Sequence, residues 1–379
     1  MSVTECARRA RTAKQLSNRL LPMNKEANSN DLPVPEPLVE VRRGAIIESR
    51  HRGYVVAVEG DGQIIAQLGE SGLVTYLRSS AKPFQVAPLI VSGAADRFEF
   101  TDREIALACG SHSGEPVHVE TVKGMLEKIK LDETWLKCGT HEPFSREVAR
   151  ELRARGERPG VLQNNCSGKH TGMLALALHL GAEPRSYDQP DNPVQIAIAN
   201  TIARFADVAV EDIAVGVDGC GVPVFGVTMR QMALMYARLV APPADFDEQT
   251  RRACERIVGA MTTYPEIIGG TSERLDTELM RAARGGLVSK VGAEGVYTAG
   301  VLPCEEWPRG LGLALKIEDG EDKRGRPTVV IESLRQLNVL RGEMLEAVTP
   351  YARFAVKNHR GDEVGEVKAN FNLNVNDGS

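Results

Sequence analysis

The sequence predicts an α+β fold: a mostly antiparallel sheet flanked by helices, with a helical lobe in addition. Strand patterns occupy residues 38–70 and return after residue 285, whereas helical patterns dominate the segment between them. Runs of strands that are separated in this way from runs of helices are typical of the α+β class. The sheet is therefore expected to take its strands from both ends of the chain, 38–77 and about 285–379.

The early strands include a predicted hairpin. Two β-rich runs, 54–58 and 63–67, flank an Asp-Gly pair at 61–62, and this arrangement is a strong hairpin signal. A hairpin makes the sheet at least partly antiparallel. His51 and Arg52, just upstream, are expected in a loop between strands.

The helical lobe is expected at about 83–280. Its clearest helix is the apolar run from Lys169 to Leu180, which Gly181 is expected to end. Further helices are predicted at 83–96, 102–109, 116–130, 145–156, 191–206, 227–240 and 247–262. Later strands are predicted at 287–290, 295–298 and 311–317, followed by a helix at 326–339 and a strand-prone tail at 350–376.

Composition excludes several classes of function. The chain has 379 residues, with 46 Lys and Arg against 51 Asp and Glu, and 5% aromatic residues. A mildly acidic chain with few aromatic rings lacks the basic footprint of a nucleic-acid binder. No stretch approaches the roughly 20 apolar residues that cross a bilayer. We therefore expect no nucleic acid and no membrane among the partners, but a small-molecule substrate.

The ends of the chain and its cysteines bear on location. Seven cysteines are scattered along the sequence, an odd number that does not resemble a disulfide framework. The N-terminus lacks the apolar core of a secretory signal, so we expect a cytoplasmic protein. Residues 1–37 are predicted to be a flexible extension and linker, and an organelle transit peptide is the alternative for 1–31. Residues 38–379 are predicted to form a single catalytic domain.

Ser79 and Lys82 form the first candidate chemical motif. On a helical turn, residues three apart share a face with Cβ atoms about 5–6 Å apart. A serine hydroxyl needs a base before it attacks, and a lysine can serve only when its amine is neutral. Burial or a neighbouring cation lowers the lysine pKa toward that state. The Ser-x-x-Lys pattern is weak by itself, and taken alone it more often marks a helix start with a solvated lysine.

Further segments carry reactive side chains. Ser111 and His112 lie in a stretch of small and hydroxyl residues, which is either a turn or a second hydroxyl site with a proton carrier. Cys166, Lys169 and His170 open the strong helix, where free N–H groups suit an anion. Two thiols with nitrogen donors suit zinc, although the separation of Cys166 and Cys220 matches no standard zinc spacing.

Two more candidate segments follow. One lies beside the end of a predicted strand, and the other lies late in the sequence. Asp218 and Cys220 lie in a glycine-rich turn after a predicted strand, a common position for ligand contacts. Lys290 lies on a late strand with a glycine two residues on, which allows close backbone approach. A structural turn and an edge-strand lysine are the alternatives.

The segments together resemble one family, the rhizobial-type (class 3) L-asparaginases, which are asparaginase II-like. The resemblance covers about residues 38–340 and rests on motifs in a fixed order: LRSSAKPFQ, ACGSHSGEPVH, NNCSGKHTGML, VDGCGVP, TSERLDTELM, GAEGVY and GLGLALKIEDG. It implies a fold similar to that of serine β-lactamases and glutaminases. It also implies two serine–lysine pairs, a bound zinc and a homodimer.

The resemblance assigns a role to each candidate residue. The catalytic pairs fall on Ser79 with Lys82 and on Ser111 with Lys290. The zinc ligands fall on a second set: Cys166, Lys169 and Cys220. Substrate contacts are expected from Arg78, His170 and Asp218. The Arg78 guanidinium would pair with the α-carboxylate of the substrate.

The expected activity is hydrolysis of the side-chain amide of L-asparagine to L-aspartate and ammonia. Ser79 is expected to attack with Lys82 as its base, and Ser111 with Lys290 to relay protons, although the sequence does not rank the two serines. A glutaminase or a penicillin-recognising hydrolase of the same fold is the alternative enzyme. An inactive zinc-containing small-molecule sensor is the alternative from another class.

Overall fold

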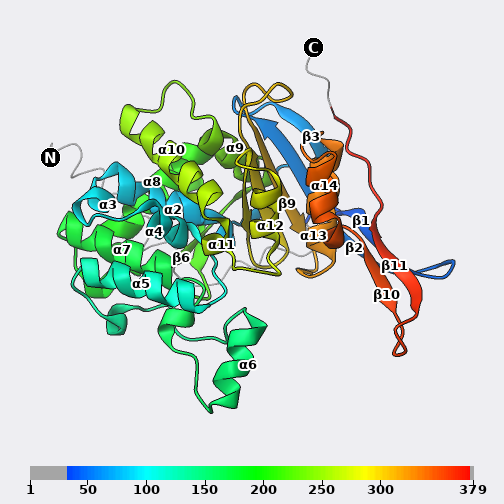
Figure 1. Cartoon of the computed structure of the whole chain (residues 1–379). Coiled ribbons are helices and arrows are strands. Elements are labelled where there is room, and N and C mark those ends of the chain that lie inside the picture. Colours follow the sequence, from blue (N-terminus) through cyan, green and yellow to red (C-terminus); the bar gives the residue numbers. More distant parts are fainter. Residues whose placement is uncertain (1–31, 376–379) are drawn as a thin grey trace. The chain divides into compact units, whose positions relative to one another are not determined.

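The computed structural model describes residues 32–375, which divide into two compact units (Figure 1). Unit 1 consists of Ala81–Gly226 and Ala244–Thr277. Unit 2 consists of residues 32–80, Val227–Pro243 and residues 278–375. The predicted extension at 1–31 lies outside the described residues, so its prediction stays open.

Unit 1 is mainly helical. Its helices, shown in cyan to yellow-green in Figure 1, are α2 (Lys82–Val91), α3 (Ala94–Arg97), α4 (Asp102–Cys109), α5 (Pro116–Lys128), α6 (Arg146–Ala154), α7 (Ser167–Leu180), α8 (Pro193–Ala206), α10 (Glu248–Thr263) and α11 (Pro265–Ile268). Short 3-10 turns, η3 to η6, lie at Glu133–Trp135, Val161–Gln163, Pro184–Ser186 and Val210–Asp212. Helix α2 packs on α4, α7, α8 and α10, and α4 packs on α7 and α10.

Local sequence signals set the ends of these helices. Thr101 and Glu104 form a reciprocal capping box at the start of α4, which satisfies backbone donors that the helix cannot. Helix α7 ends at Gly181, whose φ of 66° is the left-handed conformation that glycine adopts without strain. After α8, strand β5 (Ala214–Val217) pairs antiparallel with β6 (Pro223–Thr228), which runs past the end of unit 1.

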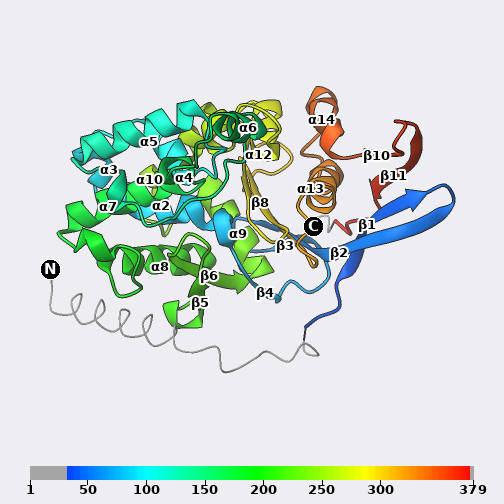
Figure 2. The same cartoon turned by 90° about the horizontal axis from the view of Figure 1, so that it is seen from below.

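Unit 2 contains an eight-stranded sheet. The strand order is β10-β11-β1-β2-β9-β8-β7, with β3 paired to β2, and every described pairing is antiparallel. The strands of unit 2 are β1 (Glu36–Arg43), β2 (Ile46–Glu59), β3 (Ile64–Leu68), β4 (Val74–Tyr76), β7 (Leu287–Val291), β8 (Val296–Val301), β9 (Leu311–Ile317), β10 (Phe354–Lys357) and β11 (Glu363–Ala369). Figure 2 shows β10 and β11 beside β1 and β2, which joins the two ends of the chain.

Helices cover this sheet. They are α9 (Met229–Val240) and α13 (Gly325–Gln336), while α14 (Glu343–Val348) packs on α13 and on the turn η7 (Thr349–Tyr351). Helix α9 packs on β2, β8 and β9, and α13 packs on β1, β8, β9 and β11. A Cβ added at Gly312 would lie 1.9 Å from the Ala233 carbonyl oxygen of α9, so this contact requires a glycine. The residues of β9 are accordingly almost all buried, although they alternate between the two faces.

Of the three other boundaries between the units in the described part of the chain, two lie within elements, and the third, at Pro243–Ala244, lies between α9 and α10. The 3-10 turn η2 (Arg78–Ala81) and helix α12 (Leu275–Ala282) each begin in one unit and end in the other. None of the helices within residues 32–375 is long and apolar enough to span a bilayer. The cytoplasmic location and the homodimer stay predictions.

The structure confirms the α+β class and the origin of the sheet strands. One local prediction is wrong: His51 and Arg52 lie inside β2, a single strand of 14 residues, and not in a loop. Charged and polar residues at this part of the strand hid the period-2 pattern. The His51 ring is buried, and its Nδ1 lies 2.8 Å from Oδ2 of Asp319, a partner 268 residues away that the local sequence does not reveal.

Candidate active site

Lys82 and Ser111 form a direct contact in unit 1. Lys82 opens α2, and its side chain is 1% exposed. Its Nζ lies 3.0 Å from the Ser111 Oγ, 2.5 Å from the Gly110 carbonyl oxygen and 3.0 Å from the Asn165 carbonyl oxygen. Burial lowers the pKa of the Lys82 amine, an effect that the nearby Cys166 opposes. The amine therefore has three oxygens in reach in a site that disfavours its charge.

Backbone contacts fix the loop that carries Ser111. The Ser111 amide donates to the Ile268 carbonyl at 2.8 Å. A Cβ added at Gly110 would lie 3.0 Å from both the Ile267 and Ile268 carbonyl oxygens, so the loop and α11 approach closely. The position of the Ser111 hydroxyl is thus set by main-chain packing and not by a flexible turn.

The neutral ring of His112 bonds to the same loop that carries Ser111. The Gly114 amide donates to its Nδ1 at 3.2 Å, so the ring proton is on Nε2, which lies 3.0 Å from the Ser167 Oγ. Burial, together with the nearby His118, lowers the His112 pKa well below its usual value. The two rings stack with centroids 5.0 Å apart. One ring nitrogen of His112 therefore bonds within the loop, and the other bonds to Ser167 at the start of α7.

The predicted zinc ligands converge in unit 1. Lys169 Nζ lies 3.1 Å from the Cys220 Sγ, and the Cys166 thiol hydrogen-bonds to Cys220. That hydrogen bond, with the Lys169 ammonium, lowers the pKa of Cys220 to about 5, and the Cys166 pKa is raised to about 12. Burial disfavours the Lys169 ammonium, but the Cys220 and Cys166 sulfurs raise its pKa overall.

The chemistry of this donor set fits a zinc ion. Cys220 contacts both Lys169 and Cys166, and adjacent donor atoms of a tetrahedral zinc site are about 3.5 Å apart. The Lys169 amine can serve as the nitrogen ligand once it has lost its proton. Within residues 32–375, no three His, Cys, Asp or Glu side chains form a cluster that could hold a metal. The predicted set differs because its third donor is a lysine amine. Zinc binding stays a prediction.

His170 and Asp218 lie next to this set. The His170 Nδ1 lies 2.7 Å from the Tyr187 hydroxyl, which accepts from the Lys137 amide. The other ring nitrogen, Nε2, is buried with no partner among the described residues. An orphaned buried polar atom fits a ligand contact. Asp218 Oδ2 lies 4.0 Å from the Cys220 Sγ.

The remaining candidates belong to unit 2. Arg78 has a φ of 51°, and its Nη1 lies 3.9 Å from Oε1 of Glu294. Lys290 is fully buried on β7, and its carbonyl oxygen accepts from the hydroxyls of Ser80 and Thr298 at 3.2 and 3.1 Å. The Ser80 hydrogen bond connects η2 to β7, the strand that carries Lys290.

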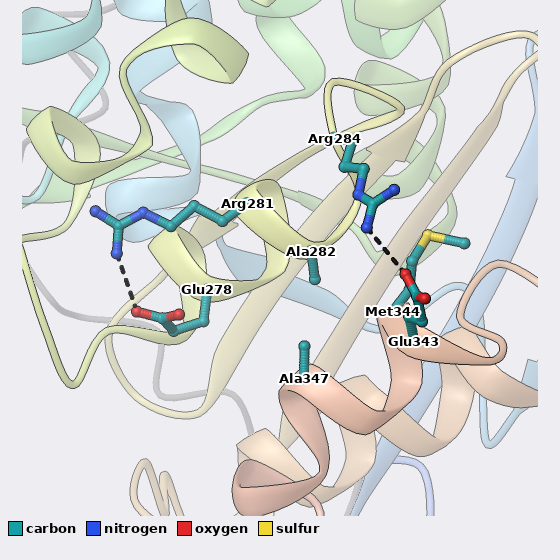
Figure 3. A pocket seen from close by; sticks show the side chains of 7 residues that line it. All are labelled: Glu278, Arg281, Ala282, Arg284, Glu343, Met344 and Ala347. Carbon is teal, nitrogen blue, oxygen red and sulfur yellow. Dashed lines mark hydrogen bonds and ion pairs between the residues drawn. The ribbon is translucent and has the colours of Figure 1, made fainter.

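Two hollows, one in each unit, are lined by other residues. In unit 2, a hollow of about 250 Å³ contains the ion pairs Arg281–Glu278 and Arg284–Glu343 (Figure 3). In unit 1, a hollow of about 530 Å³ is lined by parts of α2, α7, α8 and α10. Neither hollow contains a predicted site residue.

The comparisons with known proteins identify an enzyme of the amidohydrolase class. The family model of L-asparaginase II matches residues 39–369, and the chain belongs to this family. The match confirms the resemblance read from the motifs. A comparison with curated proteins found no match.

Solved glutaminase structures are similar to the chain. One is a probable glutaminase from Bacillus subtilis complexed with 6-diazo-5-oxo-L-norleucine, at 14% identity and a TM-score of 0.35, with 76% of this chain and 84% of that chain covered. Another is Mglu in its native form in the presence of 4.3 M NaCl, at 14% identity and a TM-score of 0.42, with 89% and 70% covered.

The structure brings together two groups of predicted residues. The first is Lys82 with Ser111, and the second is Cys166, Lys169 and Cys220. The pairing of Ser79 with Lys82 stays a prediction, because the two residues belong to different units. Tyr187 was not a candidate in the sequence, since it lies 17 residues from His170 with no motif between them.

Proposed function

We propose that this amidohydrolase is an L-asparaginase, which converts L-asparagine to L-aspartate and ammonia. The family match supports hydrolysis of an amide. The observation that carries the mechanism is the Lys82 amine, enclosed by the Ser111 hydroxyl and two carbonyl oxygens.

The surroundings of Lys82 suit a neutral amine. A neutral amine has two N–H groups and one lone pair. The carbonyl oxygens of Gly110 and Asn165 can accept the two N–H groups, which leaves the lone pair for the Ser111 hydroxyl proton. In the charged form the same three oxygens accept three donors. Lys82 can therefore take a proton and return it without rearrangement, as a general base and then a general acid must.

The two serines divide the reaction in this proposal. Ser79 is half-buried and Ser111 is 2% exposed, so Ser79 is the one that substrate reaches more easily. Its oxygen attacks the amide carbon, and its proton passes through Ser111 to Lys82. The C–N bond then breaks, ammonia leaves with that proton, and water hydrolyses the resulting ester to aspartate. Lys290 is proposed to assist the relay, as the resemblance implies.

Arg78 is proposed to bind the substrate carboxylate, because a guanidinium pairs with a carboxylate through two parallel hydrogen bonds. His170 and Asp218 are proposed as further substrate contacts, supported by the unpartnered Nε2 of His170. Cys166, Lys169 and Cys220 would hold zinc. A bound zinc supplies positive charge that can polarise an oxygen or fix its ligands in place.

Ammonia release from the purified full chain tests the function. L-asparagine as the preferred substrate supports the proposal, whereas preference for L-glutamine shows a glutaminase. Turnover of a β-lactam alone shows a penicillin-recognising hydrolase, and binding of asparagine without ammonia release shows a sensor.

Serine variants test the mechanism. Ser111→Ala is expected to lower kcat by about 10²–10⁴. Ser113→Ala is the matched control: it removes a buried hydroxyl from the same loop, one that donates to the Gly269 carbonyl instead of contacting Lys82. Trapping with 6-diazo-5-oxo-L-norleucine and peptide mapping should find the adduct on Ser79. Full activity of Ser111→Ala would refute the proton relay through Ser111.

A further inference from the structure

We propose that Arg78 and Glu294 form one recognition unit for the head group of a free α-amino acid. Arg78 receives the α-carboxylate, and Glu294 receives the α-ammonium. The inference rests on the proposed function, since it assigns a further substrate-binding residue, Glu294, to that site.

The two residues face each other across a short gap. Arg78 Nη1 and Glu294 Oε1 are 3.9 Å apart, which is too far for a direct hydrogen bond. Both backbones are left-handed, with φ of 51° at Arg78 and 58° at Glu294. At Glu294 this conformation belongs to the turn between β7 and β8, in which the Val296 amide donates to the Ala293 carbonyl. Arg78 lies outside any such hairpin turn, and there the conformation is uncommon and costly and clusters at functional sites.

The turn that carries Glu294 is firmly held. Lys316 Nζ donates to the Glu294 carbonyl at 2.6 Å, and the Gly295 amide donates to Oδ1 of Asp322 at 3.0 Å. A Cβ added at Gly292, where this turn begins, would lie 3.0 Å from the Leu77 carbonyl oxygen. The turn therefore packs against the residue that precedes Arg78.

The Glu294 side chain is accessible in spite of this rigid backbone. It is 71% exposed, whereas the Arg78 side chain is 25% exposed. An exposed ion pair of this kind contributes little to stability, so stability of the fold does not explain why these two side chains face each other. A rigid support with an accessible carboxylate is the arrangement that ligand binding requires.

The chemistry of an amino acid head group matches this pair. The α-carboxylate and α-ammonium are bonded to one carbon, so their receiving groups must be side by side. A guanidinium offers paired donors to the carboxylate. An ammonium has three donors and no acceptor, whereas an ionised glutamate only accepts. Arg78 and Glu294 supply both complements within 3.9 Å.

Binding of two dicarboxylates isolates the role of Glu294. L-aspartate and succinate differ in the α-ammonium, so titration calorimetry on the full chain should show preference for L-aspartate. Glu294→Gln should reduce that preference about tenfold, the effect of one hydrogen bond to a charged group. Glu294→Asp should retain part of it. Glu318→Gln is the matched control, since it removes one exposed carboxylate after β9 and should leave the preference unchanged.

Kinetics on paired amides give the second readout. Glu294→Gln should raise KM for L-asparagine and leave KM for succinamate, which lacks the α-amine, unchanged. Equal effects on both amides, or no effect on either, overturn the inference and leave Glu294 a structural residue. Failure of the wild-type chain to bind L-aspartate also overturns it. A wild-type chain that prefers L-aspartate but releases no ammonia refutes the proposed function and keeps the head-group site.

Discussion

A methyl group at Gly168 should disturb the candidate active site, although Gly168 is not one of the predicted site residues. Gly168 is the second residue of α7, and an added Cβ would lie 2.8 Å from both the Cγ and the carbonyl oxygen of Leu107 in α4. Ordinary carbon contacts are about 3.5–4.0 Å, so the two helices must separate by on the order of 0.7 Å. Gly172, one turn later, is the matched control, because its Cβ would lie 3.6 Å from the nearest atoms.

The two alanine variants differ in packing more than in helix propensity. Replacement of a helical glycine by alanine stabilises by up to about 1 kcal/mol, and both variants share most of this gain. Gly168→Ala adds overpacking of about 1–3 kcal/mol. We therefore expect Gly172→Ala to be more stable than wild type, and Gly168→Ala to be about 1–3 kcal/mol less stable than Gly172→Ala.

The separation of α4 from α7 should also displace the carbonyl oxygens that bind the Lys82 amine. Gly110 directly follows α4, and Asn165 lies just before α7, so their carbonyl oxygens move with the two helices. Both oxygens accept from Lys82. Gly168→Ala should lose both stability and activity, whereas Gly172→Ala should lose neither. Thermal unfolding and ammonia release measured on the same samples check this. Gly168→Ala that is as stable and active as Gly172→Ala would contradict the predicted close contact.

Two further predictions concern titration and metal. Burial, first of all, lowers the pKa of both His112 and His118, so the unfolded chain binds protons before the folded one does. Stability should therefore fall as pH decreases below about 6.5, by at most about 1.4 kcal/mol per pH unit for each ring. His112→Asn should show a shallower slope in chemical denaturation at pH 7, 6 and 5, and an identical slope would exclude this linkage. Cys220→Ser should lose zinc measured by atomic absorption, because a thiolate ligand is removed. Cys254→Ser, which alters a buried thiol outside the set, should keep it, and equal metal content in all three proteins would argue against the ligand assignment.

Local chemistry made part of the fold predictable. The Asp-Gly pair fixed the β2–β3 hairpin, and Gly181 fixed the end of α7, because turn and cap residues act within a few positions. Helix α14 was not predicted, since six residues carry too little periodicity to separate a helix from a loop. His51 was misplaced because its partner Asp319 is distant in sequence.

The candidate site was predictable in residue type more than in pairing. Motifs identified Lys82 and Ser111 separately. Their contact depends on how α2, α4 and α11 pack, and no spacing rule expresses that. The i, i+3 spacing of Ser79 and Lys82 could not reveal the contact with Ser111, because it considers one helical turn alone. A buried lysine selects its partner from the whole tertiary surroundings.

The pairing of strand β2 with β9 has a consequence for synthesis on the ribosome. Strand β2 spans Ile46–Glu59, and its neighbour β9 spans Leu311–Ile317, so more than 200 intervening residues must be translated before the two can meet. Strand β1 waits longer still, for β11 at Glu363–Ala369. Nascent chains expose unpaired strand edges during such intervals and are prone to association then. Release factors and chaperones thus meet a chain whose first-made strands are among the last to be completed.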